Sequence, residues 1–367
     1  MNDIGTLIRA ERLARYWSQE GLCRGICAVS YLSKIEQGKV EPSDEIRRLL
    51  FERLGLPTEE DSPALREAAA LLEQLTERLF LGDTPGMYAL EERFEAARPL
   101  LSRSRYAAQA ALLHEALQPV GKPLPAALEI GLDERLLAYQ RILQGRYDEA
   151  LRLYPHAFTY CSAGNAAYQR GDYRTAIALL RHAHTLAAED DAVHLMLQSR
   201  AFLGNCYCNE LRLEQMEREY AAALRLAELL HNTNLADTIR YNTAAGQLEG
   251  GQYEAACAYF SALENPGRMA LHKLAICCEK LGRPDEARTA LARARAAECD
   301  YPPEPLSQQI CDIVVFRLDH PDYLQREEYG ALLLGCFRTM RRELPAGYAS
   351  FHLPWVLEWY KANRRYK

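Results

Sequence analysis

The chain has 367 residues, 49% of them apolar and 26% charged, which indicates a folded protein of two or more domains and excludes a disordered chain. The formal net charge is −6, which excludes a protein that binds nucleic acid over its whole surface. Residues 1–57 hold nine Lys and Arg against eight Asp and Glu, a net charge of +1, so the remainder carries −7. Any contact with nucleic acid must therefore use a small, locally basic patch.

The lack of sorting signals and the spacing of the cysteines limit the class of protein further. No apolar run approaches the roughly 18 residues of a membrane span, and the charged amino terminus lacks the apolar stretch of a signal peptide. The eleven cysteines are not at metal-ligand spacing; Cys206 and Cys208 form C-x-C, and Cys277 and Cys278 are adjacent. Most lie beside Ala and Leu in helical patterns, where a free thiol behaves as a small hydrophobe. We expect reduced core thiols in a cytoplasmic protein, with no membrane contact and no metal or other cofactor.

The first residues predict a compact set of short helices. Apolar residues recur at helical spacing in residues 4–15. Ser18 is a predicted N-cap of a short second helix. A further helix covers residues 28–36 and ends at Gly38, and Ser43 opens the next one.

This succession resembles the Xre/Cro family of helix-turn-helix domains. The residues that carry the resemblance agree in order and spacing: Ile8-Arg9, Arg12, Ser18-Gln19, Leu22, Ile26, Ser30, Ile35-Glu36, Gly38 and Pro42-Ser43. The stretch GLCRGICAVSYLSKIEQGKVEPS looks closer still to the peptide-pheromone-responsive regulators of Gram-positive bacteria, the RRNPP group of PlcR- and Rgg-type proteins. The resemblance implies a DNA-binding domain over residues 1–57, in which Arg12 and Glu36 pair and tie two helices together.

The candidate DNA contacts follow from position in the motif. The second helix of a helix-turn-helix presents its amino-terminal residues to base edges in the major groove. The predicted base contacts are Ser30, Tyr31, Ser33 and Lys34. The predicted phosphate contacts are Gln19, Arg24 and Lys39. The alternative is a motif that serves only as a docking surface for protein.

A repeated pattern follows the first domain. Residues 58–64 are acidic and contain Ser and Pro, which predicts a linker. Residues 65–367 show almost no strand alternation and are rich in Ala, Leu, Glu and Arg, so we expect an all-α chain. Within them a Gly-x-Tyr pattern recurs with spacings of 26, 40, 40 and 31 residues. Its copies begin at Gly145, Gly171, Leu211, Gly251 and Gly282, of which Leu211 and Gly282 are variants.

This pattern resembles the tetratricopeptide (TPR) repeat, most clearly over residues 132–297. The resemblance implies helix pairs that stack into an α-superhelical domain with a concave surface. Residues 65–130 and 300–367 are expected to form degenerate repeats or caps.

The concave surface is the predicted ligand site. In TPR pairs the first helix lines this face, and positions six, ten and thirteen residues before the turn point inward. That register and its neighbours give nine candidate peptide-binding residues: Asn165, Gln169, Gln198, Arg200, Asn205, Asn209, Arg240, Tyr241 and Asn242. An Asn side chain can donate to a peptide carbonyl and accept from a peptide N–H, and arginine can bind a terminal carboxylate. Asn165 and Asn205 also match the TPR consensus and could serve packing alone.

No catalytic motif is found, so we do not expect an enzyme. The expected function is a transcription regulator that binds double-stranded operator DNA as a homodimer. The resemblance implies that its ligand is a short signalling peptide of the kind used in quorum sensing. Two alternatives stay open. One is a regulator that senses a protein partner or a small molecule; the other is a TPR interaction protein in which DNA binding is secondary.

Overall fold

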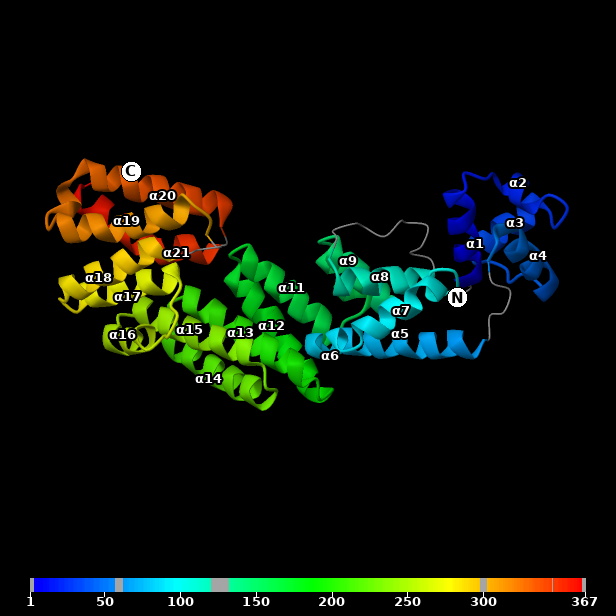
Figure 1. Cartoon of the computed structure of the whole chain (residues 1–367), viewed down its shortest axis with the longest axis horizontal. Coiled ribbons are helices and arrows are strands. Elements are labelled where there is room, and N and C mark those ends of the chain that lie inside the picture. Colours follow the sequence, from blue (N-terminus) through cyan, green and yellow to red (C-terminus); the bar gives the residue numbers. More distant parts are fainter. Residues whose placement is uncertain (1–2, 57–61, 120–131, 298–301, 345, 365–367) are drawn as a thin grey trace. The chain divides into compact units, whose positions relative to one another are not determined.

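The computed structural model describes residues 3–56, 62–119, 132–297, 302–344 and 346–364 (Figure 1). Within these ranges the chain folds into helices and forms no β-strand, which confirms the expected all-α class. The chain divides into two compact units, Met1–Ala163 with His182–Leu195, and Gly164–Arg181 with Met196–Lys367.

The amino-terminal helices are α1 (Asp3–Ala14), α2 (Gln19–Cys23), α3 (Val29–Glu36) and α4 (Asp44–Leu54). As predicted, Ser18 caps α2, where its hydroxyl accepts the Gly21 N–H at 3.0 Å, and Ser43 caps α4. These helices have an apolar core of their own, in which Ile8, Leu32 and Ile35 are fully buried. The core fixes α3 against α1, so the outward face of α3 has a defined orientation within this domain.

The rest of the first unit begins with α5 (Pro63–Leu81), which includes the last two residues of the expected linker 58–64; residues 57–61 lie outside the described residues. The helices that follow are α6 (Thr84–Tyr88), α7 (Glu91–Leu101), α8 (Ala107–Leu117), α9 (Glu134–Leu143) and α10 (Tyr147–Leu153). Their shared core includes the fully buried side chains Phe94 and Leu101.

Three helices contribute residues to both units: α11 (Ala157–Gln169), α12 (Tyr173–Glu189) and α13 (Val193–Asn209). The second unit continues with α14 (Leu213–Leu229), α15 (Thr233–Glu249), α16 (Tyr253–Ser261), α17 (Arg268–Lys280) and α18 (Pro284–Ala296). It ends with α19 (Leu306–Asp319), a 3₁₀ turn at Tyr323–Gln325, α20 (Glu327–Glu343) and α21 (Ala346–Ala362).

Every copy of the Gly-x-Tyr pattern forms a tight turn between two helices. Gly171, Gly251 and Gly282 have φ values of 78°, 83° and 72°, a left-handed conformation that glycine adopts without strain. Leu211 takes the same conformation, with φ 56°, although it has a Cβ atom. The repeat pattern thus marks the turns correctly even where its glycine is replaced.

The last helix returns to a much earlier part of the second unit. Trp359 of α21 is buried against Gly330 of α20, where an added Cβ would be 2.1 Å from the indole ring. At its other end, Gly347 lies next to Asn209 of α13. Helix α21 thus forms a wall beside the helices of the repeat.

Ten described cysteines are free and most are buried, as expected for core thiols. Across the described ranges, no helix combines the length and apolarity that a membrane span requires.

Candidate nucleic-acid interface and ligand cavity

A buried ion pair anchors the helix-turn-helix. Arg12 of α1 donates to both carboxylate oxygens of Glu36 at the end of α3, with distances of 2.6 and 2.8 Å. Gln19 adds a third hydrogen bond to Glu36 Oε2 at 2.8 Å. The expected pairing of Arg12 with Glu36 is confirmed. Because one N–H of Gln19 serves this anchor, only its second N–H remains for the predicted phosphate contact.

The outward face of α3 carries three of the four predicted base-contacting residues. Ser30 and Lys34 are exposed, and Ser33 is half-buried. Helical spacing places these three on one side of α3, whereas Tyr31 is rotated by about 100° from Ser30. Tyr31 packs against the domain core, and its hydroxyl donates to the Glu41 carbonyl at 3.4 Å. The structure therefore groups Ser30, Ser33 and Lys34 and places Tyr31 beside the core; a base contact by Tyr31 stays a prediction.

One further residue extends this face. Gln37 follows α3 at helical spacing from Ser30 and Ser33, is exposed, and donates to the Ser33 hydroxyl at 3.2 Å. The same spacing in the sequence could have identified it. Arg24 and Lys39 are both exposed beside the motif, as the predicted phosphate contacts require.

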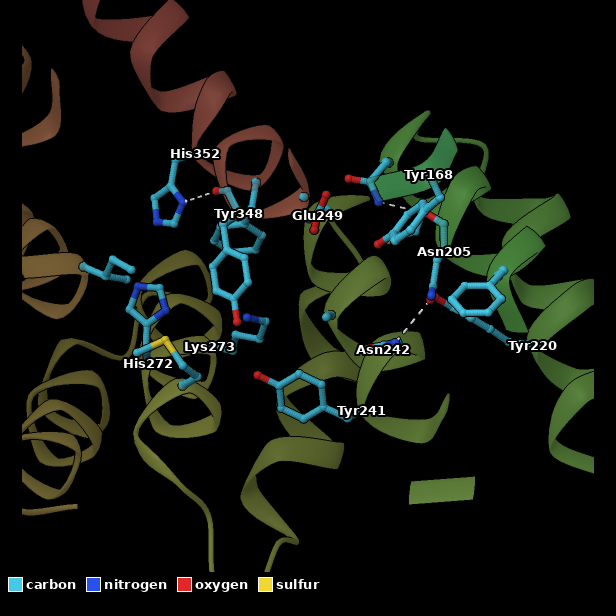
Figure 2. Close-up of a pocket in the computed structure, with 18 of the residues that line it drawn as sticks. Tyr168, Asn205, Tyr220, Tyr241, Asn242, Glu249, His272, Lys273, Tyr348 and His352 are labelled. Carbon is cyan, nitrogen blue, oxygen red and sulfur yellow. Dashed lines mark hydrogen bonds between the residues drawn. The ribbon is translucent and has the colours of Figure 1, made fainter. Parts of the chain in front are cut away.

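A cavity of about 390 Å³ lies within the second unit (Figure 2). Its walls come from the carboxyl-terminal end of α11 and from α13, α14, α15, α17, α19 and α21. Five of the nine predicted ligand-binding residues line it: Gln169, Asn205, Asn209, Tyr241 and Asn242. Its volume is in the range typical of small-ligand sites.

All four lining amides already form hydrogen bonds within the protein. Gln169 Nε2 donates to Asn165 Oδ1 at 3.4 Å. Asn205 Oδ1 accepts from the Tyr220 hydroxyl at 2.6 Å and from Asn242 Nδ2 at 3.2 Å. Asn209 donates to the Asn205 carbonyl at 2.9 Å and accepts from the Tyr173 hydroxyl at 3.2 Å. The side-chain oxygens of Asn205 and Asn209 thus hold neighbouring helices together, which is the packing role left open for Asn205.

The other four predicted residues lie away from the cavity. Arg200 pairs with Glu219 at 2.8 Å, and Arg240 pairs with Glu228 at 2.6 Å. Asn165 and Gln198 do not line it, because the cavity begins at Tyr168 on α11 and at Phe202 on α13. Arg240 is one residue from Tyr241 and so points about 100° away. Distance from the turn alone does not decide which residues line the cavity, since Tyr241 stands ten residues before its turn and lines it, whereas Asn165 stands six before its turn and does not.

Sequence reasoning missed the charged residues of the cavity. Glu249 stands two residues before its turn, as Gln169 and Asn209 do, and Lys273 stands nine before its turn, as Asn242 does. Extending the same register to later copies would have found both. Tyr348, Phe351 and His352 come from α21, which carries no copy of the pattern, so no repeat register points to them.

Burial shifts the pKa values of several titratable side chains that line the cavity. It raises the pKa of Glu249 to about 7, and the ammonium of Lys273 only partly opposes this effect. It lowers the pKa of His352 to about 4 and also lowers the pKa of His272. Lys273 Nζ lies 4.9 and 5.5 Å from the ring centres of Phe351 and Tyr241. Near neutral pH the cavity therefore presents an ammonium, neutral imidazoles and a carboxyl group that exchanges its proton readily.

Among the described residues, no group of three or more His, Cys, Asp or Glu side chains is placed to hold a metal ion. The residues that line the cavity supply hydrogen-bonding groups, charged groups and aromatic rings.

Comparison with known proteins identifies the amino-terminal domain. Residues 8–60 match the family model of the helix-turn-helix. The transcriptional activator NprA of Geobacillus stearothermophilus is 24% identical over 284 residues, which cover 68% of this chain and 67% of that protein. A crystal structure of Bacillus thuringiensis PlcR in complex with the peptide PapR7 and DNA is 16% identical, with a TM-score of 0.33, and the match covers 81% of this chain and 94% of that one. The chain therefore has an amino-terminal helix-turn-helix domain of the Xre type, followed by a body that is helical throughout its described ranges, the organisation of a transcription regulator.

Proposed function

We propose that this chain regulates transcription by binding operator DNA through α3, under the control of a short peptide bound in the cavity of the second unit. The observation that carries the DNA-binding part is the row formed by exposed Ser30 and Lys34 and half-buried Ser33, on a helix anchored by the buried Arg12–Glu36 pair. Short polar side chains and a lysine on a fixed helix are suited to hydrogen bonds with base edges in the major groove.

The peptide part is supported by the chemistry of the cavity. Gln169 and Asn242 each use one amide N–H within the protein and keep a second, and the ring of Tyr241 adds apolar surface to the lining, so backbone groups and apolar side chains of a peptide both find partners. Such a ligand controls DNA binding when its affinity differs between two arrangements of the protein. A homodimer follows from the DNA-binding mode, because this type of domain reads two half-sites related by two-fold symmetry.

The test is fluorescence anisotropy of the full chain on a labelled fragment of its own upstream region, over a salt series. We expect Ser30→Ala with Lys34→Ala to weaken binding by roughly tenfold or more, since each base contact contributes about 1–3 kcal/mol. The matched control is Ser261→Ala with Lys280→Ala, which makes the same chemical changes at exposed positions outside the domain.

Equal affinity of the two double variants would contradict DNA reading by α3. If the fragment, random genomic DNA and added culture extract all failed to reveal a site, the protein-interaction alternative would replace the regulator.

A further inference from the structure

Two charged side chains in the cavity have no charged partner. Among the described residues that line it, Glu249 is the one carboxylate and Lys273 the one ammonium. Within the described part of the chain, Glu249 makes no hydrogen bond or ion pair, and Lys273 contacts the faces of Phe351 and Tyr241. The two charges are not within the 4.0 Å of an ion pair with each other. Figure 2 shows them on separate helices, both facing the cavity.

Buried imidazoles beside Lys273 have unused hydrogen-bonding atoms as well. His272 is 1% exposed and neither ring nitrogen has a partner, and His352 Nε2 is also unpartnered. His352 Nδ1 lies 2.8 Å from the Tyr348 carbonyl, so in the neutral ring Nδ1 carries the proton and Nε2 is an acceptor. This end of the cavity can therefore bind a negative group at Lys273 and accept an N–H beside it.

Glu249 and Lys273 are both partly removed from water, which is unfavourable for an unpaired charge, and a ligand of opposite charge relieves that cost. The arginines that could have bound a carboxylate, Arg200 and Arg240, are paired elsewhere with Glu219 and Glu228. Lys273 is therefore the cation that the cavity offers to a ligand, and Glu249 is the anion.

We propose that Glu249 and Lys273 determine specificity for a zwitterionic peptide segment, with an ammonium or guanidinium group at Glu249 and a carboxylate at Lys273. This inference rests on the proposed peptide ligand and names the charges that the peptide must bring. The charges come either from the termini or from side chains, which the experiment separates.

The probes are mixtures of synthetic tetrapeptides, added to the full chain while its melting temperature is recorded. One mixture has free termini; a second is acetylated and amidated but contains Lys, Arg, Asp and Glu; a third is blocked in the same way and lacks all four. We expect the first or the second mixture to raise the melting temperature and the third to have no effect. Stabilisation by the first mixture alone assigns the charges to the termini.

Variants then identify the residues. Glu249→Gln should weaken a binding peptide by roughly tenfold or more and abolish the preference for its cationic group. Lys273→Met should weaken binding by a similar factor and abolish the preference for the carboxylate of the peptide. The matched controls are Glu254→Gln and Lys280→Met at exposed sites, which should leave affinity and preference unchanged. A loss of stability alone would lower binding of every peptide without changing the preference between charged and neutral analogues.

Two results would overturn the inference. If the neutral mixture binds as well as the charged ones, the charge specificity is wrong and the peptide ligand stands. If no mixture changes the melting temperature, the proposed peptide ligand is wrong, and the inference fails with it.

Discussion

At the scale of single residues, Glu249 makes stability depend on pH. The folded-state pKa of about 7 lies above the ordinary value of 4.5, so between these pH values the folded chain binds more protons than the unfolded one. Stability must therefore fall as pH rises through this window. The groups that interact with Glu249 are Lys273, Tyr173, Cys208 and Tyr220.

We predict that Glu249→Gln removes this loss of folding stability at higher pH. The variant should be more stable than the wild type by up to about 3 kcal/mol at pH 8, and by less than about 1 kcal/mol at pH 5. Urea unfolding of both proteins at the two pH values measures the difference. His272 and His352 destabilise the fold on acidification, but both proteins contain them, so their contributions cancel in the difference. A difference that is the same at both pH values would show that Glu249 ionises normally.

Which ion pairs could be predicted depends on how far apart in the sequence their partners are and whether a motif fixes that distance. The pairing of Arg12 with Glu36 was predicted because it belongs to a motif whose spacing is fixed within one small domain. The ion pair of Arg200 was not predicted, because Glu219 is supplied by the next helix and nothing in the α13 sequence specifies it. Sequence periodicity gives the direction of a side chain, and the neighbouring helix decides what that side chain meets.

At the scale of helices, the turns were more predictable than the packing between helices. Gly171, Gly251 and Gly282 mark their turns because the chain needs a left-handed residue there. Residues 300–367 lack such markers, so no pattern in them predicted that α19 and α21 line the cavity. Close contacts between helices depend instead on glycines within the helices.

Gly204 of α13 allows such a contact with α14. An added Cβ would be 2.3 Å from the ring of Tyr220, which is itself buried and donates to Asn205. We predict that Gly204→Ala lowers the free energy of unfolding by about 1–3 kcal/mol, because the helices must separate or the ring must move.

Gly335→Ala on α20 is the control for this substitution. It is exposed, and an added Cβ would meet nothing within 4 Å, so alanine should stabilise the helix by about 0.5–1 kcal/mol. Thermal unfolding of the two variants should shift in opposite directions. A neutral Gly204→Ala would mean that α13 and α14 pack less closely than described.

At the scale of the whole molecule, the all-α class and the amino-terminal helix-turn-helix domain were both predicted from the sequence. The homodimer remains a prediction. We expect sedimentation to give a species of twice the 41.6 kDa of the chain, and DNA with two half-sites to bind much more tightly than DNA with one. A monomer at all concentrations, with and without operator DNA, would contradict it.

Helix α21 has one more consequence, since it carries two of the three tryptophans of the chain. Trp355 lies 5.8 and 5.0 Å from the rings of Phe351 and His352, which both line the cavity, and the guanidinium of Arg317 is 4.6 Å from its ring centre. An indole held between a cation and the wall of a binding site changes its emission when that wall moves. The protein thus contains an intrinsic fluorophore for cavity occupancy, and Trp17→Phe would remove the signal of the DNA-binding domain from the same spectrum.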